Sequence, residues 1–169
     1  MEEIKKDNVT KLNEPDVIDV DLGYVEKRRF RIMGDYNRML ELNVSDLNIF
    51  SRLEAGYAQL KALGKKAQES VDKIPSEDDK EQNFSGIANT LTEIDAEMRK
   101  IVDFIFDTNA SEVCVPSGNM FDPVDGQFRF EHIIDKLTSL YATGLNAEFK
   151  KMQNNVDKRT SKYTKKGKK

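Results

Sequence analysis

The sequence has few of the residues on which catalytic and metal sites depend. It contains one cysteine, Cys114, one histidine, His132, and no tryptophan. A single cysteine excludes an internal disulfide and any zinc site built from several cysteines. A catalytic triad or a histidine-ligated metal would depend on His132 alone, which stands among apolar neighbours where packing is the simpler role. We therefore expect no enzymatic activity, no cofactor and no metal site.

Glycine-rich and acidic loops that bind phosphate or calcium are also missing. Residues 115–119 (VPSGN) lack the second glycine and the Lys-Ser/Thr pair of a phosphate-binding loop. Residues 122–126 (DPVDG) lack the alternating ligands and the terminal glutamate of a calcium loop. Both segments are typical of turns. In the second, the Asp-Pro and Asp-Gly pairs favour a turn.

Long apolar runs are absent. No stretch of 18 apolar residues occurs, so we expect no membrane span. The opening residues, MEEIKKDNVTKLNEPD, lack the apolar region of a signal peptide, and a cytoplasmic protein is therefore expected. Apolar residues make up 38% of the chain, below the ~45–50% of typical globular chains, a range that also counts glycine. Such a modest core favours a homo-oligomer that shares apolar surface.

Charge is distributed unevenly along the chain. The formal net charge is −3, yet residues 150–169 carry nine Lys or Arg and one Asp, or +8, which leaves −11 for the other residues. We expect residues 158–169 to form a basic disordered tail, because they have little apolar surface to order them. An acidic protein or a nucleic acid is an alternative partner for this tail. Support for nucleic acid is weak, because Tyr163 is the one aromatic among the lysines.

The remaining chain predicts a flexible arm followed by one domain. Residues 1–15 are polar and end at a proline, and residues 16–157 form the expected single α+β domain. Alternating apolar residues predict three short strands, at 16–22, 29–33 and 39–44. The last two strands flank a turn at 34–37 and are typical of a β-hairpin.

Apolar residues at three- and four-residue steps predict three long helices, separated by a charged linker and a long loop at 108–127. The helices are expected at 45–74, 85–107 and 128–163. The first has the apolar stripe Leu47, Phe50, Leu53, Tyr57, Leu60 and Leu63. The fold class is therefore α+β: a small antiparallel β-hairpin or sheet near the N-terminus, followed by three long helices that dominate the structure.

The last predicted helix is longer than a small domain needs. About 30 residues of helix span ~45 Å, so part of its apolar stripe is expected to face another chain. The candidate partner-binding residues are Leu137, Leu140, Tyr141, Leu145, Phe149 and Met152.

Four segments resemble small tail-region proteins of siphophages of Gram-positive bacteria. They are LELNVSDLNIFSRL at 40–53, IDAEMRKIVDFIFD at 94–107, CVPSGNMFDP at 114–123 and FRFEHII at 128–134. The resemblance is one of general pattern over residues 17–163. Such proteins are usually assigned as tail assembly chaperones, which coat the long tape-measure protein until tail-tube subunits polymerise around it.

The resemblance implies a non-enzymatic, α-rich protein in the cytoplasm of the host bacterial cell. Its partner would be a tape-measure-like protein or another phage tail protein. Two alternatives remain at the level of sequence: a phage-encoded protein that inhibits or triggers a bacterial defence enzyme, and a structural component of the virion tail. Binding to one host protein would distinguish the first, and presence in purified particles the second.

Overall fold

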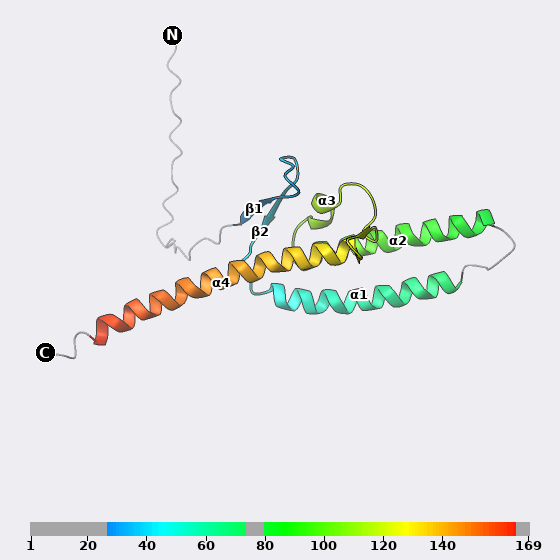
Figure 1. The fold of residues 1–169 in the computed structure, drawn as a ribbon. Helices are drawn as coiled ribbons and strands as arrows, with labels where there is room; N and C mark the ends of the chain where they lie inside the picture. Colours follow the sequence, from blue (N-terminus) through cyan, green and yellow to red (C-terminus); the bar gives the residue numbers. More distant parts are fainter. Residues whose placement is uncertain (1–26, 74–79, 165–169) are drawn as a thin grey trace, which may run out of the picture.

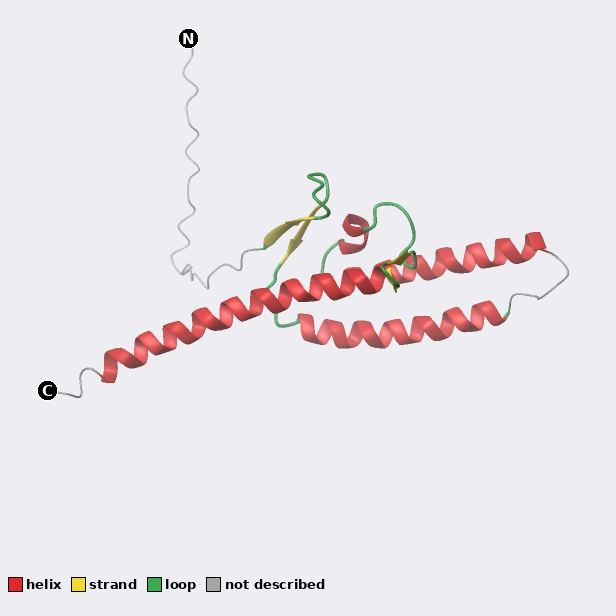
Figure 2. Cartoon of the chain, in the orientation of Figure 1, coloured by secondary structure: helices red, strands yellow, loops and turns green. Residues whose placement is uncertain are grey.

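The computed structural model describes residues 27–73 and 80–164 (Figure 1). Its elements, in chain order, are β1 (Arg28–Arg31), β2 (Met39–Leu42), α1 (Ile49–Asp72), α2 (Lys80–Phe106), α3 (Ala110–Cys114), β3 (Pro123–Val124), β4 (Gln127–Phe128) and α4 (Arg129–Thr164). Figure 2 shows that helices dominate this α+β fold and that a small antiparallel sheet precedes them, which confirms the predicted class. The predicted arm at 1–15 and strand at 16–22 lie outside the described residues.

The first β-hairpin forms where the sequence predicts it. β1 and β2 pair antiparallel, with Phe30 opposite Leu40. Inside the connection between the strands, Met33 and Gly34 have φ values of 51° and 77° and form the centre of a turn in which the Asp35 N–H donates to the Ile32 carbonyl oxygen (3.0 Å). Alternation along β2 turns Leu40 and Leu42 into the core, which they share with buried residues of α2 and α4.

Helices α1 and α2 run antiparallel, side by side (Figure 1). They approach closely at Gly56, where a Cβ atom would lie 2.4 Å from Cγ1 of Ile105. The inward face of α1 consists of Ile49, Leu53, Gly56, Leu60 and Leu63.

This arrangement corrects the apolar stripe expected for the first helix. Leu47, Phe50 and Tyr57 are exposed. A pattern built on large apolar residues passes over Gly56, although its lack of a side chain is what lets α2 pack here.

The predicted loop at 108–127 contains short elements of its own. They are the five-residue α3 and the β3–β4 hairpin. Asp125 and Gly126 form the turn of the β3–β4 hairpin, with φ values of 50° and 81°. This agrees with the turn that the Asp-Gly pair predicts.

Charged side chains hold this segment against the helices. Arg38 donates to the carbonyl oxygens of Val113 (2.9 Å) and Cys114 (2.6 Å). Arg99 donates to those of Val115 and Gly118, both at 2.9 Å. Backbone carbonyls that form no helix or sheet bonds are thereby paired.

Candidate partner-binding surface

Helix α4 is 36 residues long, and its first half lies in the core. Ile133, Leu137, Tyr141 and Leu145 are buried. The Tyr141 ring lies 6.1 Å from that of Phe106 at the end of α2. Burial raises the pKa of the Tyr141 phenol above its ordinary value, and the nearby Arg52 guanidinium opposes this shift only in part. We call Arg129–Leu145 the inner half of α4.

The inner half ends at a close crossing. A Cβ atom on Gly144 would lie 2.6 Å from both Cγ2 and the carbonyl oxygen of Val44. Glycine therefore lets α4 pack directly on the segment that joins β2 to α1. Leu145, directly after this crossing, is the last buried residue in the described part of α4.

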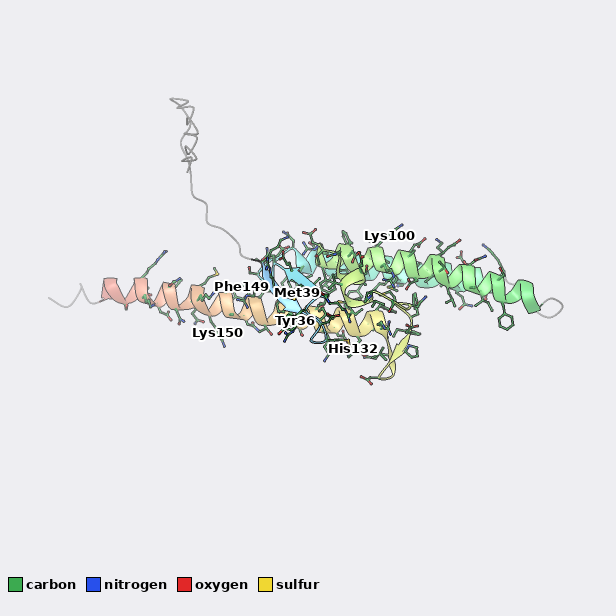
Figure 3. All side chains as sticks on the ribbon, turned by 90° about the horizontal axis from the view of Figure 1, so that it is seen from above. Tyr36, Met39, Lys100, His132, Phe149 and Lys150 are labelled. Carbon is green, nitrogen blue, oxygen red and sulfur yellow. The ribbon has the colours of Figure 1, made fainter. Side chains whose placement is uncertain are left out.

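Beyond the crossing, α4 projects away from the other elements (Figures 1 and 3). Every residue from 149 to 161 is exposed. At 1.5 Å per residue, residues 149–164 extend for about 24 Å. We call Asn146–Thr164 the outer half of α4.

The apolar stripe continues along the outer half. Phe149, Met152 and Val156 follow Leu145 at steps of four, three and four residues, so they lie on the same face. Their exposed fractions are 51%, 61% and 59%. We call these three residues the α4 stripe.

The structure divides the predicted partner-binding residues between two environments. Leu137, Tyr141 and Leu145 belong to the core, Leu140 is half-buried, and Phe149 and Met152 are exposed. The expectation that all six face another chain is therefore wrong for the three buried residues. The reason is that β2 and the segment after α3 supply apolar residues, among them Leu40, Leu42, Val115 and Met120, to the same core. Partner binding by Phe149 and Met152 stays a prediction.

The outer half has a weak intrinsic tendency to be helical. Residues 153–161 (QNNVDKRTS) contain several poor helix formers, and helices shorter than about 12–15 residues are marginal in water without tertiary contacts. Burying the α4 stripe on a partner would stabilise these turns. The outer half is thus suited to a surface that is completed by another chain.

A second exposed apolar stripe lies at the start of α2. Phe84, Ile87 and Leu91 are 72%, 43% and 46% exposed, and their three- and four-residue steps place them on one face. We call them the α2 stripe. Figure 1 shows that it lies at the opposite end of the molecule from the outer half of α4.

Ile87 and Leu91 follow the same apolar periodicity as the buried Ile94 and Met98, so periodicity alone does not reveal that they are exposed. This part of α2 is half open, which the apolar periodicity of the helix does not predict.

Of the reactive groups named from the sequence, Cys114 packs against the core. Burial raises the pKa of the Cys114 thiol to about 11, despite the opposing charge of Arg38, so the thiolate nucleophile is scarce at neutral pH. His132 is half-buried at the start of α4. Among residues 27–73 and 80–164, no three His, Cys, Asp or Glu side chains gather to form a metal site.

Two aspartates that could have suggested acid–base chemistry are hydrogen-bonded to backbone. Asp95 accepts the N–H of Met120 (2.6 Å) and pairs with Arg99 (2.8 Å). Asp103 accepts the N–H (2.6 Å) and the hydroxyl (2.9 Å) of Ser111. Their oxygens hold the segment after α2 rather than facing an open cleft.

The described part of the chain has an open groove between two of its long helices. It runs between α1 and α2 and is bordered by Lys66, Glu97 and Lys100. Lys66 and Glu97 form an ion pair across it. A drug-sized ligand usually needs an enclosed apolar pocket, so this groove is a poor candidate for one.

Comparison with known proteins gives no match: no family model, no curated protein and no solved structure is similar to this chain. None of the helices in the described ranges combines the length and apolarity of a membrane span.

Proposed function

We propose that this chain is a non-enzymatic assembly protein that binds a helical protein partner along the outer half of α4. The observation that carries the proposal is the continuity of one apolar stripe from the core into solvent. Leu145 is 6% exposed and Phe149, one turn later, is 51% exposed. A stripe of this kind is the usual surface of a helix that pairs with another amphipathic helix.

The resemblance of residues 40–53, 94–107, 114–123 and 128–134 to tail proteins of siphophages selects the class of partner. We propose a tape-measure protein, with the chain acting as a tail assembly chaperone in the cytoplasm of the bacterial host. A long helical client offers many apolar stripes and aggregates while these are uncovered. A chaperone that projects a helix can cover such a stripe without any chemical step.

Co-expression with a helical fragment of the cognate tape-measure protein tests the proposal. Met152→Glu places a carboxylate in the centre of the α4 stripe. Burying an unpaired charge in an apolar interface costs several kcal/mol, which corresponds to a loss of affinity of about 100-fold or more. We expect a soluble complex with the wild type and an insoluble client with the variant.

Asn154→Glu is the matched control. Asn154 lies on the opposite face of the same helical segment and is exposed, so the variant adds the same charge outside the stripe. It should solubilise the client as the wild type does. A Met152→Glu protein that folds and still keeps the client soluble would show that α4 is not the binding surface.

A further inference from the structure

The two exposed stripes match each other in spacing. The α4 stripe has its three residues at positions i, i+3 and i+7, and the α2 stripe repeats this pattern. Each presents an aromatic residue first and two aliphatic or thioether side chains after it, all more than 40% exposed. Two such faces can pack as neighbouring helices, with the side chains of one helix fitting between those of the other.

The helical segments that carry the stripes have opposite charge. Residues 80–100 of α2 contain four acidic and three basic residues, and two of the acidic residues, Asp95 and Glu97, pair with Arg99 and Lys66, so this segment has a small negative net charge. Residues 149–164 of α4 contain five basic residues and one acidic residue. Opposite charge favours encounter between these two surfaces and disfavours pairing of either surface with itself.

The two stripes of one molecule cannot meet. They lie at opposite ends of the structure, with the core between them (Figures 1 and 3). A contact between them therefore requires two copies of the chain.

We propose that the α4 stripe of one copy packs on the α2 stripe of a second copy. The contact joins two different surfaces, so it is heterologous. Two copies can form this contact twice, each α4 stripe packing on the α2 stripe of the other copy. Alternatively, each copy can contact the next one and build a longer head-to-tail chain.

One consequence rests on the proposed function. If the α4 stripe also binds the client, a second copy covers this stripe in the free protein and the client displaces it. The chaperone would then keep its own apolar surface covered until a client is present. The contact between copies does not depend on this consequence.

Sedimentation velocity at micromolar protein concentration tests the contact. The wild type should exceed the monomer mass, and Met152→Glu and Phe84→Glu should each weaken association by about 100-fold or more. Both substituted side chains are largely exposed, so the variants should keep the thermal midpoint of the wild type in the monomeric state. Raised salt should weaken the wild-type contact, because opposite net charges contribute to it.

A mixture of the two variants identifies the surfaces in contact. The Met152→Glu copy retains an intact α2 stripe, and the Phe84→Glu copy retains an intact α4 stripe. Mixed in equal amounts, they should recover a heterodimer that neither forms alone. Asn154→Glu and Asn89→Glu, which add the same charge to exposed positions on the opposite faces of the two helices, should associate as the wild type does.

Three results would overturn the inference. They are a wild type that stays monomeric at high concentration, a Phe84→Glu variant that associates normally, and a mixture that remains monomeric. Normal association of Phe84→Glu together with loss in Met152→Glu would assign the contact to two α4 helices. Client binding is measured separately: Phe84→Glu should still solubilise a tape-measure fragment, so failure of self-association and failure of the chaperone function are distinguishable.

Discussion

The two halves of α4 share one helix and one apolar stripe but have different surroundings. The inner half supplies Ile133, Leu137, Tyr141 and Leu145 to the core, whereas every residue from 149 to 161 is exposed. Periodicity therefore shows that a face is built to be buried, but not which chain buries it. The boundary is set by where the rest of the fold ends, at the crossing of Gly144 and Val44.

Charge changes at the same boundary. Residues 129–145 contain two basic and two acidic residues, whereas residues 149–164 contain five basic residues and one acidic residue. Basic side chains keep the outer half soluble while its stripe is uncovered and favour an acidic partner surface. The inner half needs neither property, because its stripe is already enclosed.

Alanine substitutions at two residues one helical turn apart should show the largest difference in stability between the two halves of α4. Leu145→Ala removes a side chain that is 6% exposed, and such changes in a core cost about 2–5 kcal/mol of unfolding free energy. Phe149→Ala removes a side chain that is 51% exposed and should cost less than about 1 kcal/mol in the monomer. Urea unfolding at low protein concentration measures both values. Equal losses would mean that Phe149 is also enclosed by its own chain.

The sequence predicted most of the elements but not the position of this boundary. The β-hairpin, the three long helices and the Asp125-Gly126 turn follow from local patterns. Which residues of a stripe are covered depends on tertiary contacts, such as those of Val44 with Gly144 and of Ile105 with Gly56. Neither glycine adds to an apolar pattern, so both close approaches were invisible to it.

The roles of Arg38 and Arg99 were equally hidden from sequence reasoning. Both donate to carbonyl oxygens between 16 and 76 residues away in the chain. A surface arginine and a structural one have the same sequence signature. The exposure of the α2 stripe was hidden in the same way, because apolar periodicity does not show which turns of a helix are covered.

Substitutions of two helical glycines should locate the crossing. In Gly144→Ala, the new Cβ meets Cγ2 and the backbone oxygen of Val44 at 2.6 Å, and such overpacking costs about 1–3 kcal/mol. Gly64→Ala, within α1, meets no atom within 4 Å and should instead stabilise the protein by about 0.5–1 kcal/mol. Thermal unfolding of the two variants should therefore shift in opposite directions. A stabilised Gly144→Ala variant would place α4 farther from Val44.

The pH dependence of the unfolding free energy should test the Asp46–Arg52 ion pair. Asp46 pairs with Arg52 (2.9 Å), and Arg52 also donates to the carbonyl oxygen of Ile105 (2.9 Å). Burial raises the pKa of the Asp46 carboxyl, but the hydrogen bond from the Asn48 N–H and the Arg52 charge outweigh this effect, so its pKa lies below the ordinary value.

The direction in which stability changes with pH follows from the lowered pKa of the Asp46 carboxyl. The Asp46 carboxylate stabilises the fold at neutral pH, and this contribution disappears as the pH falls below about 4. Asp46→Asn keeps an acceptor for the Asn48 N–H but removes the charge, so it should cost less than about 1 kcal/mol at pH 7. Unfolding free energies of the wild type and the variant should converge towards pH 3. A constant difference across this range would show that the Asp46 charge is unimportant.

Removal of residues 158–169 should have the smallest effect on the monomer. Residues 158–161 lie in the last turns of α4 and are exposed, so the loss of these four residues removes no core contact. The unfolding free energy at low protein concentration should change by less than about 0.5 kcal/mol. Association between copies should nevertheless weaken, because seven of the nine basic residues in 150–169 are lost. A stability loss that persists on dilution would show that the segment packs on its own chain. A loss that vanishes on dilution would assign its contacts to a second copy.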